Sequence, residues 1–386
     1  MTTISVNQQN NSDVGKQDLS VKDFQTIVYF AVGVSSESKL KAYSLEIAAN
    51  QNKDGTLRPI ANSGYSVGTI QTDLGQHPEA AKDLVNAYQK WAEIRQPDWK
   101  LSENQEKAII HDLGRTGRDI RSEGGRPLNP EFRSRLNQFL ASEDGITWVH
   151  MRDTKQINKI EQIIFNPLQQ TELYKRLPIE EKTHLVAVTS KLYNQSETWG
   201  KRVLQEIQDG KHHTIRAVDN KIDMIIAAKD DYIETGRKEA VLGATLISRL
   251  DSLDPKNPLF DKWKEIKAEP LINPAGLEGV QKEAYNEIRK LFVDPEKSIN
   301  MLKRQEGKEF NVSHSKQSEF SALINGLMND KDGSFTQKIL ADNRDVIDDF
   351  DKRLQLKTYQ DDKLAVQSPQ QENQQEERSR SGRVVG

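Results

Sequence analysis

Apolar residues recur at helical spacing along most of this chain. The first clear element follows a polar leader at residues 1–19, where Ser20 and Asp23 have the spacing of a capping box. An apolar run at residues 24–32 follows and is broad enough to be buried on most sides of a helix. We expect Gly33 to close this helix, because glycine is common just beyond helical C-termini.

The same periodicity predicts further helices downstream. Their apolar stripes lie within residues 78–94, 103–113, 130–140, 157–166, 185–193, 203–207, 222–232 and 241–250. Pro78 suits a first helical turn, and Ser102 with Gln105 forms a second capping box. We expect the helix around residue 160 to end before Pro167, since proline disrupts a helix interior.

A breaker-rich segment, LDPKNP at residues 253–258, marks a candidate domain boundary. We therefore expect a helical catalytic domain over residues 20–255 and a charged helical accessory domain over residues 256–358. Stripes at residues 280–291, 320–327 and 339–354 predict the helices of the second domain. The leader and the polar tail at residues 359–386 have the composition of disordered segments.

Residues 47–76 break the helical pattern. Asn and Gly punctuate short extended pieces here, and Asp54-Gly55 is a typical turn pair. The sequence therefore predicts a mainly α-helical protein with one small β-hairpin or loop region, plus a C-terminal helical accessory region.

Composition narrows the function classes. The 386 residues carry 55 Lys+Arg against 58 Asp+Glu, a net charge of −3, which argues against nucleic-acid binding by bulk phosphate attraction. Apolar runs are too short to span a bilayer, and the polar leader is unlike a secretory signal. Zero cysteines exclude disulfides and thiolate chemistry.

Carboxylates around the turn-rich segment are candidate catalytic groups. Glu37 follows the apolar helix, Glu46 and Asp54 come next, and Asp73 follows the glycines. Burial raises the pKa of a carboxyl, and one protonated carboxyl beside ionised ones is the arrangement that glycoside hydrolysis uses. The alternative is that these are solvated surface acids, which is the common state of Glu and Asp.

The string NSGYSVGTIQTDLGQ at residues 62–76 is rich in small polar groups. Its glycines permit close backbone approach, and Tyr65, Ser66 and Gln71 offer hydroxyl and amide partners of the kind that sugars require. An ordered loop without a ligand is the alternative interpretation of the same composition.

These motifs together resemble the lysozyme-like superfamily of goose-type and phage lysozymes and lytic transglycosylases. In that superfamily a catalytic Glu ends a buried helix, and a Gly-x-x-Gln segment follows. Here Gly68-Thr69-Ile70-Gln71 comes 31 residues after Glu37 and 22 after Glu46. The motif resemblance covers residues 28–78 and is closest to the lysozyme domains of exported antibacterial effectors.

The resemblance implies roles for individual residues. Glu37 or Glu46 is the general acid: Glu37 fits the helix-end placement, whereas Glu46 fits the Glu-to-Gln spacing and precedes Asp54 as in phage lysozymes. Ser66, Gln71 and Asp73 are implied to position substrate or activate water, with Tyr65 beside them. Ser38 departs from the pattern, because many relatives have Gly after the Glu.

Other motifs carry less chemistry. The seven histidines show no His-Glu-x-x-His pattern, and no metal or cofactor is expected. The basic run at residues 114–127 lacks Gly-Lys-Ser/Thr and so is not a phosphate-binding loop; a groove lining for acidic peptides and a solvated loop both fit it.

The resulting hypothesis is an N-acetylmuramidase that acts on peptidoglycan glycan strands. It is expected to be made in the cytoplasm without a signal peptide and exported by a dedicated secretion system, or released by lysis, to the target-cell periplasm. A secretion-system component and a cognate immunity protein are the expected protein partners. A lytic transglycosylase and a non-catalytic helical peptidoglycan-binding or scaffold protein are the alternatives.

Overall fold

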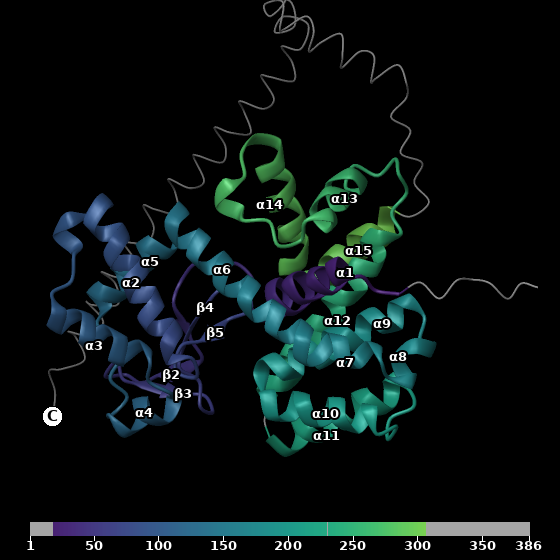
Figure 1. Ribbon diagram of the computed structural model, residues 1–386, viewed down its shortest axis with the longest axis horizontal. Coiled ribbons are helices and arrows are strands. Elements are labelled where there is room, and N and C mark those ends of the chain that lie inside the picture. Colours follow the sequence, from purple (N-terminus) through teal and green to yellow (C-terminus); the bar gives the residue numbers. More distant parts are fainter. Residues whose placement is uncertain (1–17, 230, 306–386) are drawn as a thin grey trace, which may run out of the picture. The chain divides into compact units, whose positions relative to one another are not determined.

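The computed structural model describes residues 18–229 and 231–305 (Figure 1). Helices account for 70% of these residues and strands for 5%, so the prediction of a mainly α-helical protein with a small antiparallel sheet region is confirmed. Most of the predicted leader, the expected helices at residues 320–327 and 339–354, and the polar tail lie outside the described residues.

The chain begins with one helix in two parts, α1 (Val21–Thr26) and η1 (Ile27–Ser38), and η1 has the wide turns of a π-helix. The predicted capping box is confirmed, with Ser20 and Asp23 bonded reciprocally. The expectation that Gly33 ends the helix is wrong. A Cβ at residue 33 would lie 2.8 Å from Cγ2 of Thr69, so this glycine allows a close contact inside the helix. Glu37 therefore lies within the last helical turn.

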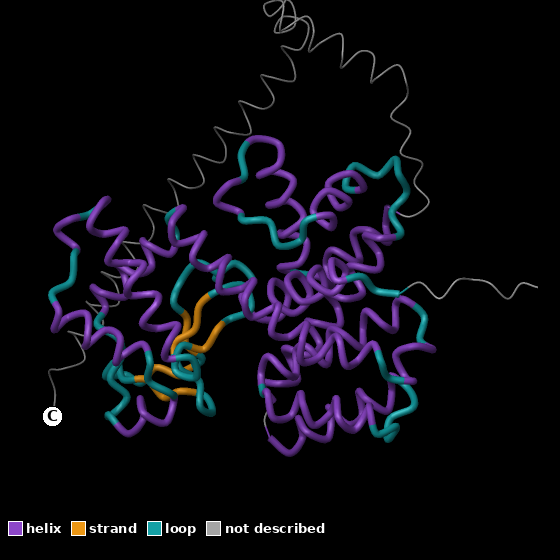
Figure 2. Tube along the Cα trace, viewed as in Figure 1, coloured by secondary structure: helices purple, strands orange, loops and turns teal. Residues whose placement is uncertain are grey.

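Five short strands follow: β1 (Glu46–Ile47), β2 (Ala49–Gln51), β3 (Leu57–Pro59), β4 (Tyr65–Val67) and β5 (Thr72–Asp73). β2 and β3 form the predicted hairpin, whose turn contains Asp54-Gly55. β1, β4 and β5 form a second antiparallel sheet in the order β1-β4-β5, with Glu46 opposite Ser66 and Ser66 opposite Asp73. Figure 2 shows all five strands gathered in one place beside helices.

The next helices enclose the strands on one side. They are α2 (Pro78–Arg95), η2 (Pro97–Trp99), α3 (Glu103–Leu113), α4 (Gly117–Ser122), α5 (Pro130–Leu140) and α6 (Glu143–Ile160). The capping box of Ser102 and Gln105 is confirmed at the start of α3. α6 continues through η3 (Glu161–Phe165) and α7 (Asn166–Gln169), so the predicted end before Pro167 is wrong. Pro167 follows a widened π-type turn and lies at the start of α7, where its missing N–H is tolerated.

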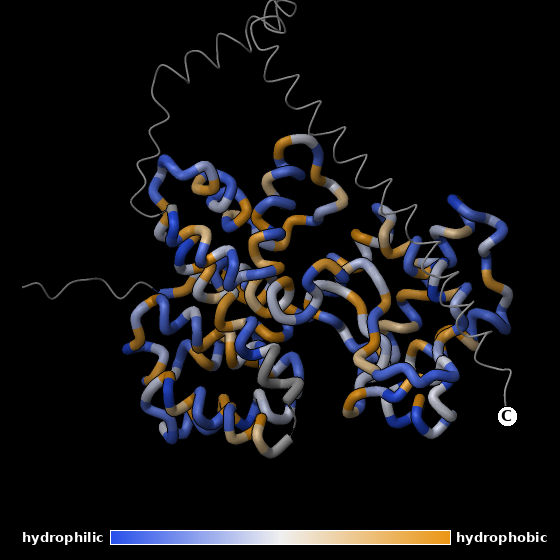
Figure 3. Tube along the Cα trace, turned by 180° about the vertical axis from the view of Figure 1, so that it is seen from behind, coloured by the Kyte–Doolittle hydropathy of each residue, from blue (hydrophilic) through white to orange (hydrophobic). Residues whose placement is uncertain are grey.

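The remaining described helices complete the fold. They are α8 (Glu172–Arg176), α9 (Ile179–Gln195), α10 (Glu197–Gln208), α11 (Ile215–Lys229), α12 (Asp231–Asp251), α13 (Phe260–Ala268), η4 (Pro274–Gly276), α14 (Gly279–Val293) and α15 (Pro295–Gln305). Figure 3 shows apolar and polar positions alternating along most of them, the pattern of amphipathic helices that bury one face. No helix in the described part combines the length and apolar content needed to cross a membrane.

Buried apolar side chains form two clusters. The helical cluster surrounds η1 and includes residues of α9 and α12, while the sheet-side cluster joins β4 to α2, α3 and α5. α6 contributes to both clusters, with Val149 in the sheet-side cluster and Ile157 in the helical cluster. The turn between β4 and β5 also joins them, since Val67 belongs to the sheet-side cluster and Ile70 to the helical one.

Residues 256–305 share the helical cluster. The Phe292 ring of α14 lies 5.0 Å from that of Phe30 in η1, and Trp263 of α13 lies 6.2 Å from the same ring. Both regions belong to the same compact unit. In the described structure, the segment after the predicted boundary near residue 255 therefore packs on the same core as the helices before it.

Candidate functional site

Glu37 is held at the end of η1 by two side chains of α9. Its side chain is 7% exposed, and that of Lys191 is 2% exposed. Lys191 Nζ donates to Glu37 Oε1 at 2.5 Å, and Asn194 Nδ2 donates to the same oxygen at 2.9 Å. Lys191 and Asn194 are three residues apart, so they lie on the same side of the helix.

Asn194 also connects Glu37 to the predicted Gly-x-x-Gln segment. Its Nδ2 donates a second hydrogen bond to the carbonyl oxygen of Ile70 at 3.0 Å. Its Oδ1 accepts a hydrogen bond from Gln156 Nε2 at 2.6 Å, and Thr72 Oγ1 donates to Gln156 Oε1 at 2.5 Å. A directed chain of donors therefore runs from Thr72 through Gln156 and Asn194 to Glu37.

The loop at Gly68–Gln71 is built on Asp153 of α6. The backbone N–H of Thr69 donates to Asp153 Oδ2 at 2.9 Å, and that of Ile70 to Oδ1 at 3.4 Å. A Cβ at residue 68 would lie 2.5 Å from Asp153 Oδ1, and Gly68 has a φ of +100°, so only glycine fits here. Burial raises the pKa of Asp153 to about 6, although the Thr69 hydrogen bonds partly oppose this shift.

Gln71 and Ser66 bond each other on the other side of this loop. Ser66 Oγ donates to Gln71 Oε1 at 2.6 Å, and Gln71 Nε2 donates to the Gly68 carbonyl at 2.8 Å. Glu46 lies opposite Ser66 in the sheet and so shares its face. The Glu46 carboxylate accepts from Ser44 Oγ at 3.0 Å and pairs with Lys41 at 3.1 Å. Glu37 is thus bonded through Asn194 to the turn that contains Gln71, and Glu46 lies opposite the serine that bonds Gln71.

Three other predicted residues accept hydrogen bonds from backbone N–H groups. Asp54 is fully exposed at the hairpin turn, where hydrogen bonds from Thr56 lower its pKa. Tyr65 is buried, and its hydroxyl accepts the N–H of Leu128 at 2.7 Å; burial raises the pKa of this tyrosine. Asp73 accepts backbone N–H groups, among them that of Gly64 at 3.1 Å, and burial raises its pKa. In the structure these side chains organise turns.

Several residues of the site were missed by sequence reasoning: Lys191, Asn194, Gln156 and Asp153. One signal was available for Lys191. It lies in a stretch of α9, Leu185 to Tyr193, in which every residue is buried. A lysine inside a buried helix requires a partner. Nothing local marks Asp153 or Gln156, whose partners lie 38 to 84 residues away along the chain.

Buried hydroxyl groups form a further contact with the loop at Gly68–Gln71. The hydroxyl oxygens of Tyr29 and Tyr285 lie 2.6 Å apart, and Thr69 Oγ1 donates to Tyr29 at 3.4 Å. Burial raises the pKa of both tyrosines. Arg289 of α14 lies over the Tyr43 ring at 5.8 Å and donates to the Lys39 carbonyl at 3.1 Å. α14 therefore supports both the loop and the turn that follows Glu37.

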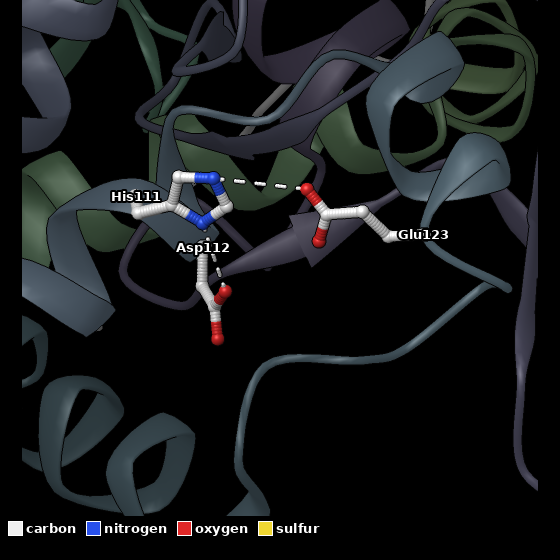
Figure 4. Close-up of side chains that lie close together, drawn as sticks. All are labelled: His111, Asp112 and Glu123. Atoms are coloured by element: carbon white, nitrogen blue, oxygen red, sulfur yellow. Dashed lines mark hydrogen bonds and ion pairs between the residues drawn. The ribbon is translucent and has the colours of Figure 1, made fainter.

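A second cluster of titratable groups lies at His111, Asp112 and Glu123 (Figure 4). One ligand atom from each lies within 4.8 Å of the others, the spacing that a metal site needs. Two guanidinium groups already neutralise these carboxylates. Arg126 contacts Asp112 at 2.6 Å, and Arg115 contacts Glu123 at 3.0 Å. Burial raises the pKa of Asp112, but the Arg126 hydrogen bonds, the charges of Arg115 and Arg126 and the His111 hydrogen bond together lower it below its ordinary value. The cluster is thus an ion-pair network.

A surface hollow of about 480 Å³ between α9, α11 and α12 includes none of the candidate residues. It is lined by Glu180, Glu181, His184, Ile215, Ala244, Thr245, Ser248, Arg249 and Ser252.

Comparison with models of protein families, with curated proteins and with solved structures found no match for this chain. The resemblance to the lysozyme-like superfamily therefore stays a prediction from its motifs. The structure defines a mainly α-helical protein in which a nearly buried carboxylate, a buried lysine and an amide chain meet beside a tight glycine-containing turn.

Proposed function

We propose that this protein is a peptidoglycan glycan-strand hydrolase, an N-acetylmuramidase of lysozyme-like type. It would cleave the β-1,4 bond between N-acetylmuramic acid and N-acetylglucosamine. The observation that carries the proposal is the hydrogen-bonded link from Glu37 through Asn194 to Ile70. The motif resemblance requires a helix-end Glu and a Gly-x-x-Gln segment to act together, and this link joins them.

Glu37 is the proposed general acid. It gives a proton to the glycosidic oxygen as the bond to the sugar C1 breaks, and the electron pair of that bond stays on the departing oxygen. Glu46 is the proposed second carboxylate, which stabilises the cationic sugar or activates a water. Gln71 and Ser66, which bond each other, would orient the substrate.

A lytic transglycosylase is the second candidate, and one observation favours it. Glu37 is bonded to Lys191 and Asn194, while Glu46 is bonded to Lys41 and Ser44. Asp54 is fully exposed at its hairpin turn. An enzyme with a single working carboxyl, which leaves an anhydro sugar end, is consistent with this separation.

The proposal extends to the setting in which the enzyme works. By resemblance alone, it would be an exported antibacterial effector or a phage-like lysin that acts in the target-cell periplasm. Its partners would be glycan strands, a secretion-system component and a cognate immunity protein.

The test is incubation of the purified chain with isolated sacculi, followed by mass spectrometry of the soluble products. Reducing muramic acid ends would support the muramidase, and anhydro ends would identify a transglycosylase. Glu37→Gln, Glu46→Gln and Asp54→Asn are compared in parallel, with circular dichroism to check folding. Intact sacculi with the folded wild-type chain would contradict both reactions and leave a binding or scaffold role.

A further inference from the structure

α9 contains two buried lysines, and they differ in what they bond. Lys182 has a side chain that is 3% exposed and pairs with Asp18 at 3.4 Å, and Asp18 is itself 61% exposed. Lys191 is 2% exposed and pairs at 2.5 Å with Glu37, which is 7% exposed. At Lys191 both charges are therefore removed from water.

A glycine of α12 leaves space for the Lys191 ammonium, and a glycine in a helix interior lowers the stability of the helix. A Cβ at residue 236 in α12 would lie 2.6 Å from Lys191 Cε and 2.8 Å from Nζ, so a larger residue there would displace the end of the Lys191 side chain. Glycine lowers the stability of a helix interior, and a buried ion pair is often no more stabilising than a packed apolar pair. Stability alone is therefore a weak explanation for this lysine.

The geometry distinguishes the two oxygens of Glu37. Oε1 accepts hydrogen bonds from both Lys191 Nζ and Asn194 Nδ2. The Asn194 amide is itself oriented, because its Oδ1 accepts from Gln156. With two donors fixed on Oε1, a proton on the carboxyl belongs on Oε2.

We propose that Lys191 is a positioning residue of the candidate site, which holds Oε1 so that Oε2 exchanges the proton with the substrate. This inference rests on the proposed function. Oε2–H gives its proton to the glycosidic oxygen, and the carboxylate left behind is stabilised by Lys191 and Asn194. An incoming water then returns one proton to Oε2 and leaves its hydroxyl on C1.

Other charged groups on the packed elements are already engaged. Lys39 pairs with Glu239 of α12 at 2.7 Å, and Arg289 of α14 donates to the Lys39 carbonyl. Asp153 of α6 accepts the backbone N–H groups of the loop. Lys191 is therefore the cation whose removal changes the charge around Glu37 most directly.

The first test compares Lys191→Met with Lys182→Met in the full chain, with sacculus-derived glycan strands as substrate. Both variants remove one buried lysine from the same helix, so both are expected to lower the melting temperature by several degrees. Lys191→Met is expected to lower kcat by about 100-fold with little change in KM, the size seen for loss of one charge-stabilising donor. Lys182→Met should retain the wild-type kcat.

A second variant and a spectroscopic readout distinguish a specific effect on the site from loss of folding. Asn194→Ala keeps the lysine and removes the other donor, and it should lower kcat by about 10-fold. The ¹³C chemical shift of the Glu37 carboxyl, assigned by its loss in Glu37→Gln, should change in Lys191→Met and match the wild type in Lys182→Met. An active wild type with unchanged kcat and an unchanged carboxyl signal in Lys191→Met would overturn this inference alone. An inactive wild type would overturn the proposed function, and this inference with it.

Discussion

The candidate charged groups beside the helical cluster and those on the sheet side differ in how far they are removed from water. Beside the helical cluster, Glu37, Lys191 and Asp153 are nearly or fully removed from water. On the sheet side, Glu46 is 29% exposed and Asp54 is fully exposed. Burying a charge is costly unless partners compensate it, so the buried set requires contributions from η1, α6 and α9 together.

This difference indicates where function is concentrated. The exposed acids bond neighbours close in sequence, as Asp54 does with Thr56 and Glu46 with Ser44. Glu37, Lys191 and Asp153 bond partners that are 83 to 157 residues away. Strongly desolvated groups with specific partners are characteristic of catalytic sites, which places the weight of our proposal on Glu37.

The largest expected effect is on catalysis. Glu37→Gln keeps the shape of the side chain but cannot donate a carboxyl proton, so kcat on glycan strands should fall by about 1,000-fold, within the usual range for general acids. Glu46→Gln should lower kcat less, because the Glu46 side chain is partly solvated. Initial rates of muropeptide release measure both. A larger loss for Glu46→Gln would move the general acid to the sheet side.

The stability of the protein should be sensitive to one methyl group added in the loop between the two clusters. Gly68→Ala places a Cβ against Asp153 and strains a φ of +100°, and we expect a loss of about 3 kcal/mol in the free energy of unfolding. Gly124→Ala is the matched control. Gly124 has a φ of +72° but no atom within 4 Å of its would-be Cβ, so it should lose only about 1 kcal/mol. Urea titrations compare the two, and equal losses would refute the role of the Asp153 contact.

Asp153 should make stability depend on pH. Its pKa is raised by burial from 3.8 to about 6, so the folded state binds a proton more tightly than the unfolded state. The resulting stabilisation is fully present below pH 3.8 and is lost as pH rises through about 6. Two pKa units correspond to about 3 kcal/mol.

The measurement for Asp153 is urea unfolding at several pH values. Asp153→Asn removes this titration, so its free energy of unfolding should vary less than that of the wild type between pH 4 and pH 6.5. Parallel curves for the two proteins would show that the buried carboxyl titrates outside this window.

The smallest effect is expected at the hairpin turn. Asp54→Asn retains an oxygen that accepts from Thr56, and the side chain is fully exposed. Activity on glycan strands should stay within about two-fold of wild type, as for most exposed charges away from a reaction centre. A loss comparable to that of Glu46→Gln would instead assign Asp54 a direct part in the reaction.

Local interactions let the sequence by itself determine much of the framework. The capping boxes at Ser20 and Ser102, the start of α2 at Pro78 and the Asp54-Gly55 hairpin turn all match the structure. Each depends on groups a few residues apart, whose contacts form whenever the local backbone does. Glu37 was expected just beyond the buried helix, whereas the structure places it within the last helical turn.

Tertiary packing decided the rest. Gly33 was expected to end a helix, but it lies inside one because Thr69 packs against it. Lys191, 154 residues from Glu37, becomes its partner only when α9 packs beside η1. Which charges are buried, and by which partners they are compensated, depends on contacts between distant segments, and no local spacing encodes those contacts.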